Sequence, residues 1–131
     1  MSYLDTLGYT DKHLWVRTEG DLVRIGITHV GVAATGDLVF VELAEPGTRV
    51  EAGSPIGSVE SVKSVFELTA PVDGEVVAIN EHVIERPAYV ASEPFGFGWL
   101  MRIRWDAPPA GLMDRAAYMA LPRPPGPVSA V

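Results

Sequence analysis

A short phrase made of one glycine, one acid and two apolar residues occurs three times in this chain and does most to limit its fold. The copies are Gly20-Asp21-Leu22-Val23, Gly36-Asp37-Leu38-Val39 and Gly74-Glu75-Val76-Val77. The glycine and the acid favour a turn, and the β-branched or apolar pair that follows favours a strand. The segments EPGTRVEAGSPIG and TAPVDGE add Pro or Gly every few residues, which excludes long helices there. We therefore predict a mainly β fold through the middle of the chain.

The stretch LVFVELA, residues 38–44, shows the partial alternation of a strand with one covered face. This pattern predicts Val39, Val41 and Leu43 on one face, with Phe40 and Glu42 on the other. Four aromatic side chains are expected in the core rather than in a binding cage: Trp15, Phe40, Trp99 and Trp105.

Two segments favour helix. Residues 28–35 give a weak signal from two valines and two alanines. Residues 111–121 contain good helix formers, and their spacing places Leu112, Ala116 and Met119 near one face. A short C-terminal helix is therefore predicted.

The length of 131 residues predicts one domain, which we assign to residues 1–121. Apolar residues make up 47% of the chain and charged residues 21%, a composition typical of a folded globular protein. The last ten residues, PRPPGPVSAV, hold four prolines and little to bury. Residues 122–131 are therefore predicted to form a Pro-rich disordered tail.

The formal charge of −7 excludes several classes of partner. An acidic chain repels a phosphate backbone, so we expect no nucleic-acid partner. The start MSYLDTLGYTDKHLWV lacks the features of a signal peptide, and no apolar run approaches the roughly 20 residues of a membrane span. We expect a cytoplasmic monomer. Because there is no cysteine, any sulfur chemistry must come from a bound group.

The segment VESVKSVFEL, residues 59–68, contains Lys63, one of only two lysines beside eight arginines. A helix would place Val59, Val62 and Phe66 on one buried face, but the valines and serines are poor helix formers. A hairpin fits better, with strands GSVES and SVFEL and with Val62 and Lys63 at the turn. Only lysine offers a primary amine that can be acylated to a stable amide, so Lys63 is our candidate site of modification.

Several motifs in order resemble the glycine cleavage system H protein family. The stretch GITHVGVAATGDLVFVELAEPGTRVEAGSPIGSVESVKSVFELTAPVDGEVVAIN resembles its lipoyl-carrying core, and YTDKHLWVR and EPFGFGWLMRI resemble its flanking motifs. The ESVKS segment matches the family's lipoylation site, which places the lipoyl group on Lys63. The surrounding hairpin residues Glu60, Val62, Ser64 and Glu67 complete the candidate cofactor site.

The resemblance implies a lipoyl-domain-like fold, a barrel-sandwich hybrid of two small antiparallel sheets with short helices. It also implies a non-catalytic carrier whose lipoate is joined by an amide to Lys63. That arm would shuttle the aminomethyl group of glycine between glycine decarboxylase, aminomethyltransferase and dihydrolipoamide dehydrogenase. A lipoate-attaching enzyme would be a further partner.

Some residues depart from the family pattern. His29, Val30 and Gly31 stand where an acid, an aromatic and an alanine are common, and Phe97 stands where a charged or small residue is more usual. These positions concern surfaces that partners read. A divergent H-like protein serving lipoate relay or lipoate-dependent sulfur oxidation is therefore an alternative hypothesis, and an unmodified binding module is another.

Other functions find less support. His13, His29 and His82 share no metal-ligand spacing, so we expect no metal site. No Ser/His/Asp or paired-carboxylate pattern indicates an enzyme. Biotin carriers use a similar hairpin, but methionines usually flank their lysine, whereas Val62 and Ser64 flank Lys63 here.

Overall fold

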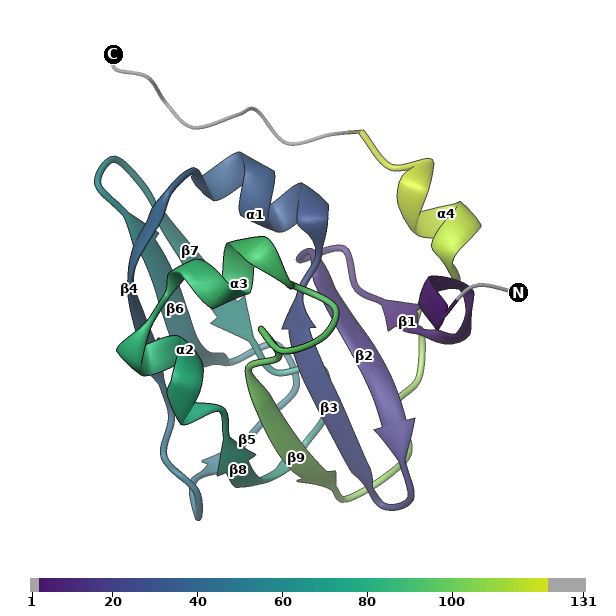
Figure 1. The fold of residues 1–131 in the computed structure, drawn as a ribbon. Helices are drawn as coiled ribbons and strands as arrows, with labels where there is room; N and C mark the ends of the chain where they lie inside the picture. Colours follow the sequence, from purple (N-terminus) through teal and green to yellow (C-terminus); the bar gives the residue numbers. More distant parts are fainter. Residues whose placement is uncertain (1–2, 123–131) are drawn as a thin grey trace.

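The computed structural model describes residues 3–122, which form two antiparallel β-sheets with short helices around them (Figure 1). The six-stranded sheet has the order β1-β2-β3-β9-β8-β5, and the three-stranded sheet has the order β4-β6-β7. The larger sheet comprises β1 (Gly8–Tyr9), β2 (Leu14–Glu19), β3 (Leu22–Ile27), β9 (Met101–Trp105), β8 (Gly74–Ile79) and β5 (Arg49–Val50). The smaller sheet comprises β4 (Leu38–Leu43), β6 (Pro55–Ser61) and β7 (Val65–Thr69). The predicted fold class is confirmed.

Each copy of the repeated phrase begins a strand, as predicted: β3, β4 and β8. Glycine is required at two positions of these phrases, for different structural reasons. Gly20 adopts a φ of 64° in the two-residue turn between β2 and β3, a conformation that favours glycine. Gly74 lies against β9, where an added Cβ would come within 2.0 Å of the carbonyl oxygen of Arg104.

The main core lies between the two sheets. Val41 of β4 and Val59 of β6 face inward from the small sheet and are almost fully buried. Val23, Ile25 and Ile103 contribute from the large sheet to the same apolar cluster and are fully buried. Burying a side chain of this size stabilises the fold by about 1.5–3 kcal/mol. The packing of the sheets therefore fixes the position of the β6–β7 hairpin.

The predicted alternation along β4 is wrong at its first residues. The pairing of β4 with β6 shifts between Leu38 and Phe40, so one extra residue is inserted there as a β-bulge. As a result Leu38 is buried, while Val39, predicted to share a face with Val41, is exposed. Phe40 is also exposed, so the prediction that it lies in the core is wrong. The three tryptophans are buried or half-buried.

The helices only partly match the prediction. α1 (His29–Thr35) lies in the expected segment, and its N-cap Thr28 accepts a hydrogen bond from the amide of Gly31. The C-terminal helix α4 (Arg115–Met119) is shorter than predicted, because its N-cap Asp114 begins it later. Three short helices were not predicted: the 3₁₀ helix η1 (Tyr3–Thr6), α2 (Glu81–Glu85) and α3 (Ala88–Ser92). The predicted tail, apart from Pro122, lies outside the described residues.

The buried face of α4 also differs from the prediction. Ala116 and Met119 are exposed, and the buried residue is Tyr118, whose ring stacks on Tyr9 with 5.0 Å between the ring centroids. The Tyr118 hydroxyl lies 2.6 Å from Oγ1 of the buried Thr28 and 2.7 Å from Nδ1 of His13. His13 has a φ of 65°, which is uncommon for a residue other than glycine. One hydroxyl therefore links the C-terminal helix, the start of α1 and the turn before β2.

Removing this hydroxyl tests how strongly it holds the three segments together. We expect Tyr118→Phe to lower the free energy of unfolding by about 1–2 kcal/mol, because it leaves polar groups of Thr28 and His13 without this partner. Urea denaturation measures the change. Tyr89→Phe is the matched control, since the Tyr89 hydroxyl makes no hydrogen bond within residues 3–122. An equal fall in the free energy of unfolding in both variants would show that the Tyr118 hydroxyl does not hold these segments together.

Burial lowers the pKa of the His13 imidazole from its usual value of about 6.5; the charge of Asp11 opposes this shift and that of Lys12 adds to it. As the pH falls below about 6.5, the His13 imidazole therefore binds a proton more readily in the unfolded chain than in the folded chain. We therefore expect the His13 contribution to stability to be complete above about pH 6.5 and to be lost as the pH falls through the lower folded-state pKa. Urea denaturation at several pH values should show a weaker pH dependence in His13→Asn than in the wild type. Identical pH profiles for the variant and the wild type would show that His13 does not cause this loss of stability.

Candidate functional site

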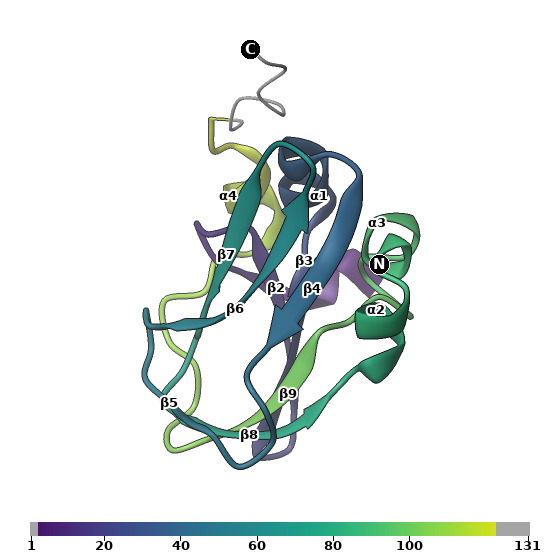
Figure 2. The same ribbon diagram turned by 90° about the vertical axis from the view of Figure 1, so that its left-hand side faces the viewer.

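Lys63 lies at the tip of the β6–β7 hairpin, as predicted from the sequence. The register pairs Glu60 with Val65, and the amide of Ser61 donates to the carbonyl of Ser64, which leaves Val62 and Lys63 as the two turn residues. In the views of Figures 1 and 2 the tip projects at one end of the molecule. Lys63 is exposed, and its side chain has no ion pair or hydrogen bond among the described residues.

Two serines, one on each side of the turn, hold its shape. Both turn residues have negative φ angles, so this is not the I′ or II′ turn that usually closes a two-residue hairpin. Instead, Oγ of Ser61 accepts hydrogen bonds from the amides of Lys63 at 3.3 Å and Ser64 at 3.0 Å. The serine side chain thereby substitutes for part of the backbone bonding of the turn.

Ser64 fastens the tip to the neighbouring helix. Its hydroxyl donates to the carbonyl oxygen of Thr35, the last residue of α1, at 3.0 Å. Thr35 is itself buried, and its Oγ1 donates to the carbonyl of Gly31 at 2.9 Å. The backbone under Lys63 is therefore anchored, while its side chain stays free to extend. Neither Ser61 nor Thr35 was predicted from the sequence. The serines that flank Val62 and Lys63 were a visible signal for Ser61, whereas the role of Thr35 depends on a contact between distant segments.

The other predicted site residues lie around the tip in different roles. Val62 is 83% exposed beside Lys63. Glu60 and Glu67 lie in neighbouring rows on the outer face of the small sheet. Glu60 pairs with Phe40 of β4, whereas Glu67 pairs with Ser58, which in turn pairs with Glu42. A hollow of about 190 Å³ lies beside the tip, lined by Lys63 together with residues 35–37 and 61–62.

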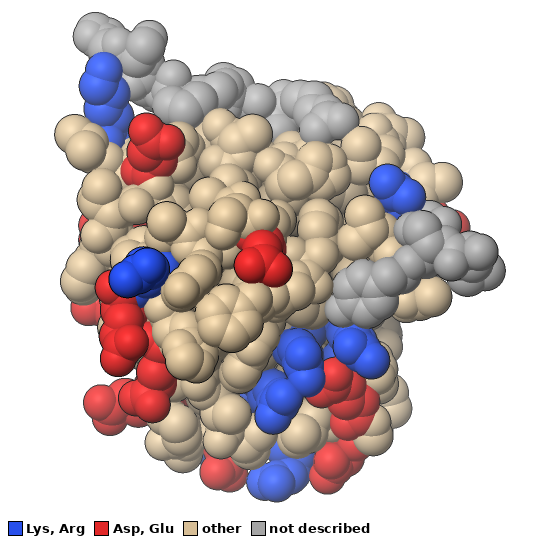
Figure 3. Space-filling view, viewed as in Figure 1, with Lys and Arg blue, Asp and Glu red and all other residues tan. Residues whose placement is uncertain are grey.

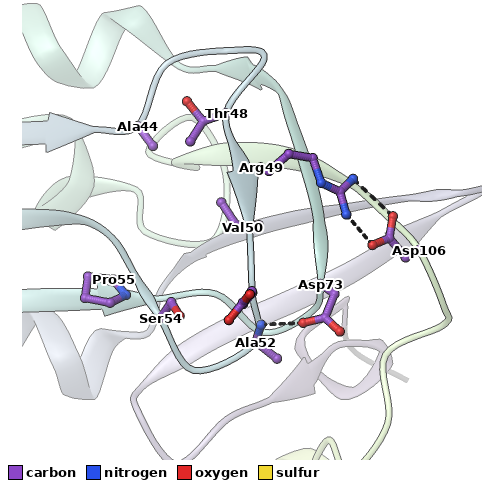
Figure 4. A pocket seen from close by; sticks show the side chains of 10 residues that line it. Ala44, Thr48, Arg49, Val50, Ala52, Ser54, Pro55, Asp73 and Asp106 are labelled. Atoms are coloured by element: carbon purple, nitrogen blue, oxygen red, sulfur yellow. Dashed lines mark hydrogen bonds and ion pairs between the residues drawn. The ribbon is translucent and has the colours of Figure 1, made fainter.

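A second hollow, of about 650 Å³, lies near β5 at the opposite end of the molecule from the tip (Figures 1 and 4). At its edge the Arg49 guanidinium forms a bidentate ion pair with the Asp106 carboxylate. The Asp73 carboxylate accepts a hydrogen bond from the amide of Ala52 at 2.7 Å. The hydrogen bond between Arg49 and Asp106 raises the pKa of the arginine and lowers the pKa of the aspartate. These polar groups are already paired with one another, so nothing marks this hollow as the functional site.

Basic side chains gather away from the hairpin. Figure 3 shows them over β2, β3 and β9, interspersed with acids. The register places Arg17, Arg24 and Arg102 in one row on the outer face of the large sheet, and all three lie within 4 Å of the Glu19 carboxylate. In contrast, β4, β6 and β7 contain no Lys or Arg. The hairpin sheet is thus acidic apart from Lys63 at its tip.

No group of three or more His, Asp or Glu side chains within residues 3–122 is placed to hold a metal ion. Two of the three histidines pack against separate phenylalanines, His29 on Phe95 and His82 on Phe97. In that same part of the chain no helix is long and apolar enough to cross a membrane.

Two small antiparallel sheets that display a lysine on an anchored hairpin define a carrier domain. A family model described as Glycine cleavage H-protein matches residues 7–121. The glycine cleavage system H protein of Thermosynechococcus vestitus is 42% identical over 121 residues, covering 92% of this chain and 95% of that protein. The corresponding protein of Corynebacterium jeikeium is 48% identical over 117 residues, covering 86% and 91%.

The comparison of folds indicates the same family. A crystal structure of a glycine cleavage system H protein from Mycobacterium marinum matches with a TM-score of 0.81 and 41% identity, covering 87% of this chain and 94% of that one. The chain belongs to the glycine cleavage H-protein family. These matches support the lipoyl-carrier role in glycine cleavage that the sequence predicts.

The anchoring of the tip can be tested with Ser64→Ala, which removes the bond to Thr35. We expect the free energy of unfolding to fall by about 1 kcal/mol and the amides of residues 61–64 to exchange faster with solvent. Hydrogen exchange followed by NMR measures the second effect. Ser58→Ala, on the outer face of β6 and without a side-chain hydrogen bond in the described chain, is the control. If both variants exchange alike, Ser64 does not anchor the tip.

Proposed function

We propose that Lys63 carries the lipoyl group, joined as an amide to its Nζ atom. The observation that carries this proposal is the free, exposed Lys63 side chain on a backbone held by Ser61 and Ser64, in a chain that belongs to the H-protein family. The site fits such a group, because nothing in the described chain blocks the approach of an attaching enzyme to the amine. The only other lysine, Lys12, lies in the turn between β1 and β2.

The bound group would supply what the chain lacks. The sequence contains no cysteine, and lipoate contributes a dithiolane able to accept and hand on the aminomethyl group of glycine. The residues of this chain would then present the arm rather than react. The hairpin fixes the attachment point, the exposed stem of Lys63 lets the arm reach outward, and tethering raises its effective concentration at an enzyme's active site.

The partners that this role requires are glycine decarboxylase, aminomethyltransferase and dihydrolipoamide dehydrogenase, together with an enzyme that attaches lipoate. A monomeric carrier serves these partners in turn, since one arm has to enter several active sites. The chain itself acts as a carrier subunit and not as the catalyst.

Exchanging each lysine for arginine separates the two candidates for modification. We expect Lys63→Arg to abolish lipoylation and glycine-dependent turnover in the reconstituted system, because the guanidinium forms no such amide. Lys12→Arg should keep both. Intact mass and the glycine assay are the readouts, and urea denaturation should show a change in stability below about 0.5 kcal/mol for either variant. A fully active Lys63→Arg protein would defeat the assignment.

A further inference from the structure

The outer face of the small sheet exposes apolar side chains around the hairpin tip. Val39, Phe40, Val62 and Val65 are 56%, 49%, 83% and 63% exposed. Phe40 and Val65 lie in one row with Glu60 between them, since Glu60 pairs with both. We call these four apolar residues the apolar collar. In Figure 2 this side of β4, β6 and β7 faces the viewer, and no other element of residues 3–122 crosses it.

The collar depends on a specific irregularity in the backbone. A regular strand would turn Val39 and Phe40 to opposite faces, as the sequence pattern predicted. The bulge between Leu38 and Phe40 leaves both side chains in solvent, in the strand next to the Lys63 hairpin. Bulges are common beside functional sites, where they redirect a side chain. Exposed apolar residues that are grouped rather than scattered mark surfaces that bind something.

The charges around the collar indicate what it binds. Glu42, Glu60 and Glu67 lie on the same outer face, and β4, β6 and β7 contain no Lys or Arg. Lys63 is the only Lys or Arg from residue 50 to residue 85, and acylation would remove its charge. The strands of this face then present acidic, apolar and neutral polar side chains but no positive charge. A second copy of the chain would place acids against acids, which opposes self-association through this face.

We propose that the apolar collar and its acids form the docking surface for the enzymes that act on the arm. The matching surface of such an enzyme, at the entrance to its active site, combines apolar side chains with Lys or Arg. This inference rests on the proposed function, because it is the arm on Lys63 that has to enter that site. It adds that recognition extends from the hairpin tip across the sheet to β4, through Val39 and Phe40.

The test replaces collar residues by threonine, which suits a strand but removes apolar surface. The variant combines Val39→Thr, Phe40→Thr and Val65→Thr. The control is Ile84→Thr on α2, where Ile84 is 40% exposed and outside the collar. Intact mass confirms that each protein is lipoylated, and thermal unfolding confirms that it is folded. The apparent KM and kcat for each carrier are then measured with glycine decarboxylase, aminomethyltransferase and dihydrolipoamide dehydrogenase.

We expect the collar variant to raise the KM about tenfold or more with at least one of the three enzymes while kcat at saturation is kept, and the control to stay within about twofold. Glu60→Gln with Glu67→Gln should also raise that KM and make it less sensitive to salt. If the KM of the collar variant equals that of the control with all three enzymes, the proposal is wrong. A wild-type dimer that the collar substitutions dissociate would also overturn it, by identifying a second copy as the occupant.

The same comparison in a chain without an arm separates this inference from the proposed function. In the Lys63→Arg background, calorimetric titration of the three enzymes reports docking alone, and the collar substitutions should weaken it about tenfold. Absence of binding to every enzyme, or equal binding with and without the collar, overturns the docking surface. A wild-type chain that carries no lipoate would instead defeat the proposed function and leave this binding comparison valid.

Discussion

Burial of the inner faces of two sheets against each other is the constraint on which the rest of this structure depends. Val41 and Val59 from the small sheet join the same cluster as Ile25 and Ile103 from the large one. That packing fixes the β6–β7 hairpin, because the inner row of residues on its strands belongs to the core. A rigid base is what a carrier of a mobile arm requires, since the enzymes it serves then meet one geometry.

Where the core ends, polar contacts continue the support. Ser61 closes the turn and Ser64 binds the end of α1, while the start of α1 is held through Thr28 to Tyr118. The Ser61 bonds lie within the turn, whereas the Ser64–Thr35 and Thr28–Tyr118 bonds join segments that are far apart in the sequence. The side chain of Lys63, at the end of the series, has no hydrogen-bond or ion-pair partner among residues 3–122. The contrast between an anchored backbone and a free side chain is what marks the site.

The sequence predicted the features that depend on local patterns. Gly and an acid mark the starts of β3, β4 and β8, and the V-K turn follows from residue types on both sides. Features set by tertiary contact could not be predicted in this way. The bulge that exposes Val39 adds one residue to an otherwise alternating strand, and the Ser64–Thr35 bond joins residues 29 positions apart. The short helices α2 and α3 are shorter than the periodicity that reveals a helix.

Whether Lys63 is the lipoyl attachment site can be decided from the mass of the protein purified from its native cells. The measurement is the intact mass of the purified chain, followed by peptide mapping of Lys12 and Lys63. We expect one lipoyl increment, located on Lys63, with Lys12 unmodified. An unmodified Lys63 in cells that lipoylate other proteins would contradict it.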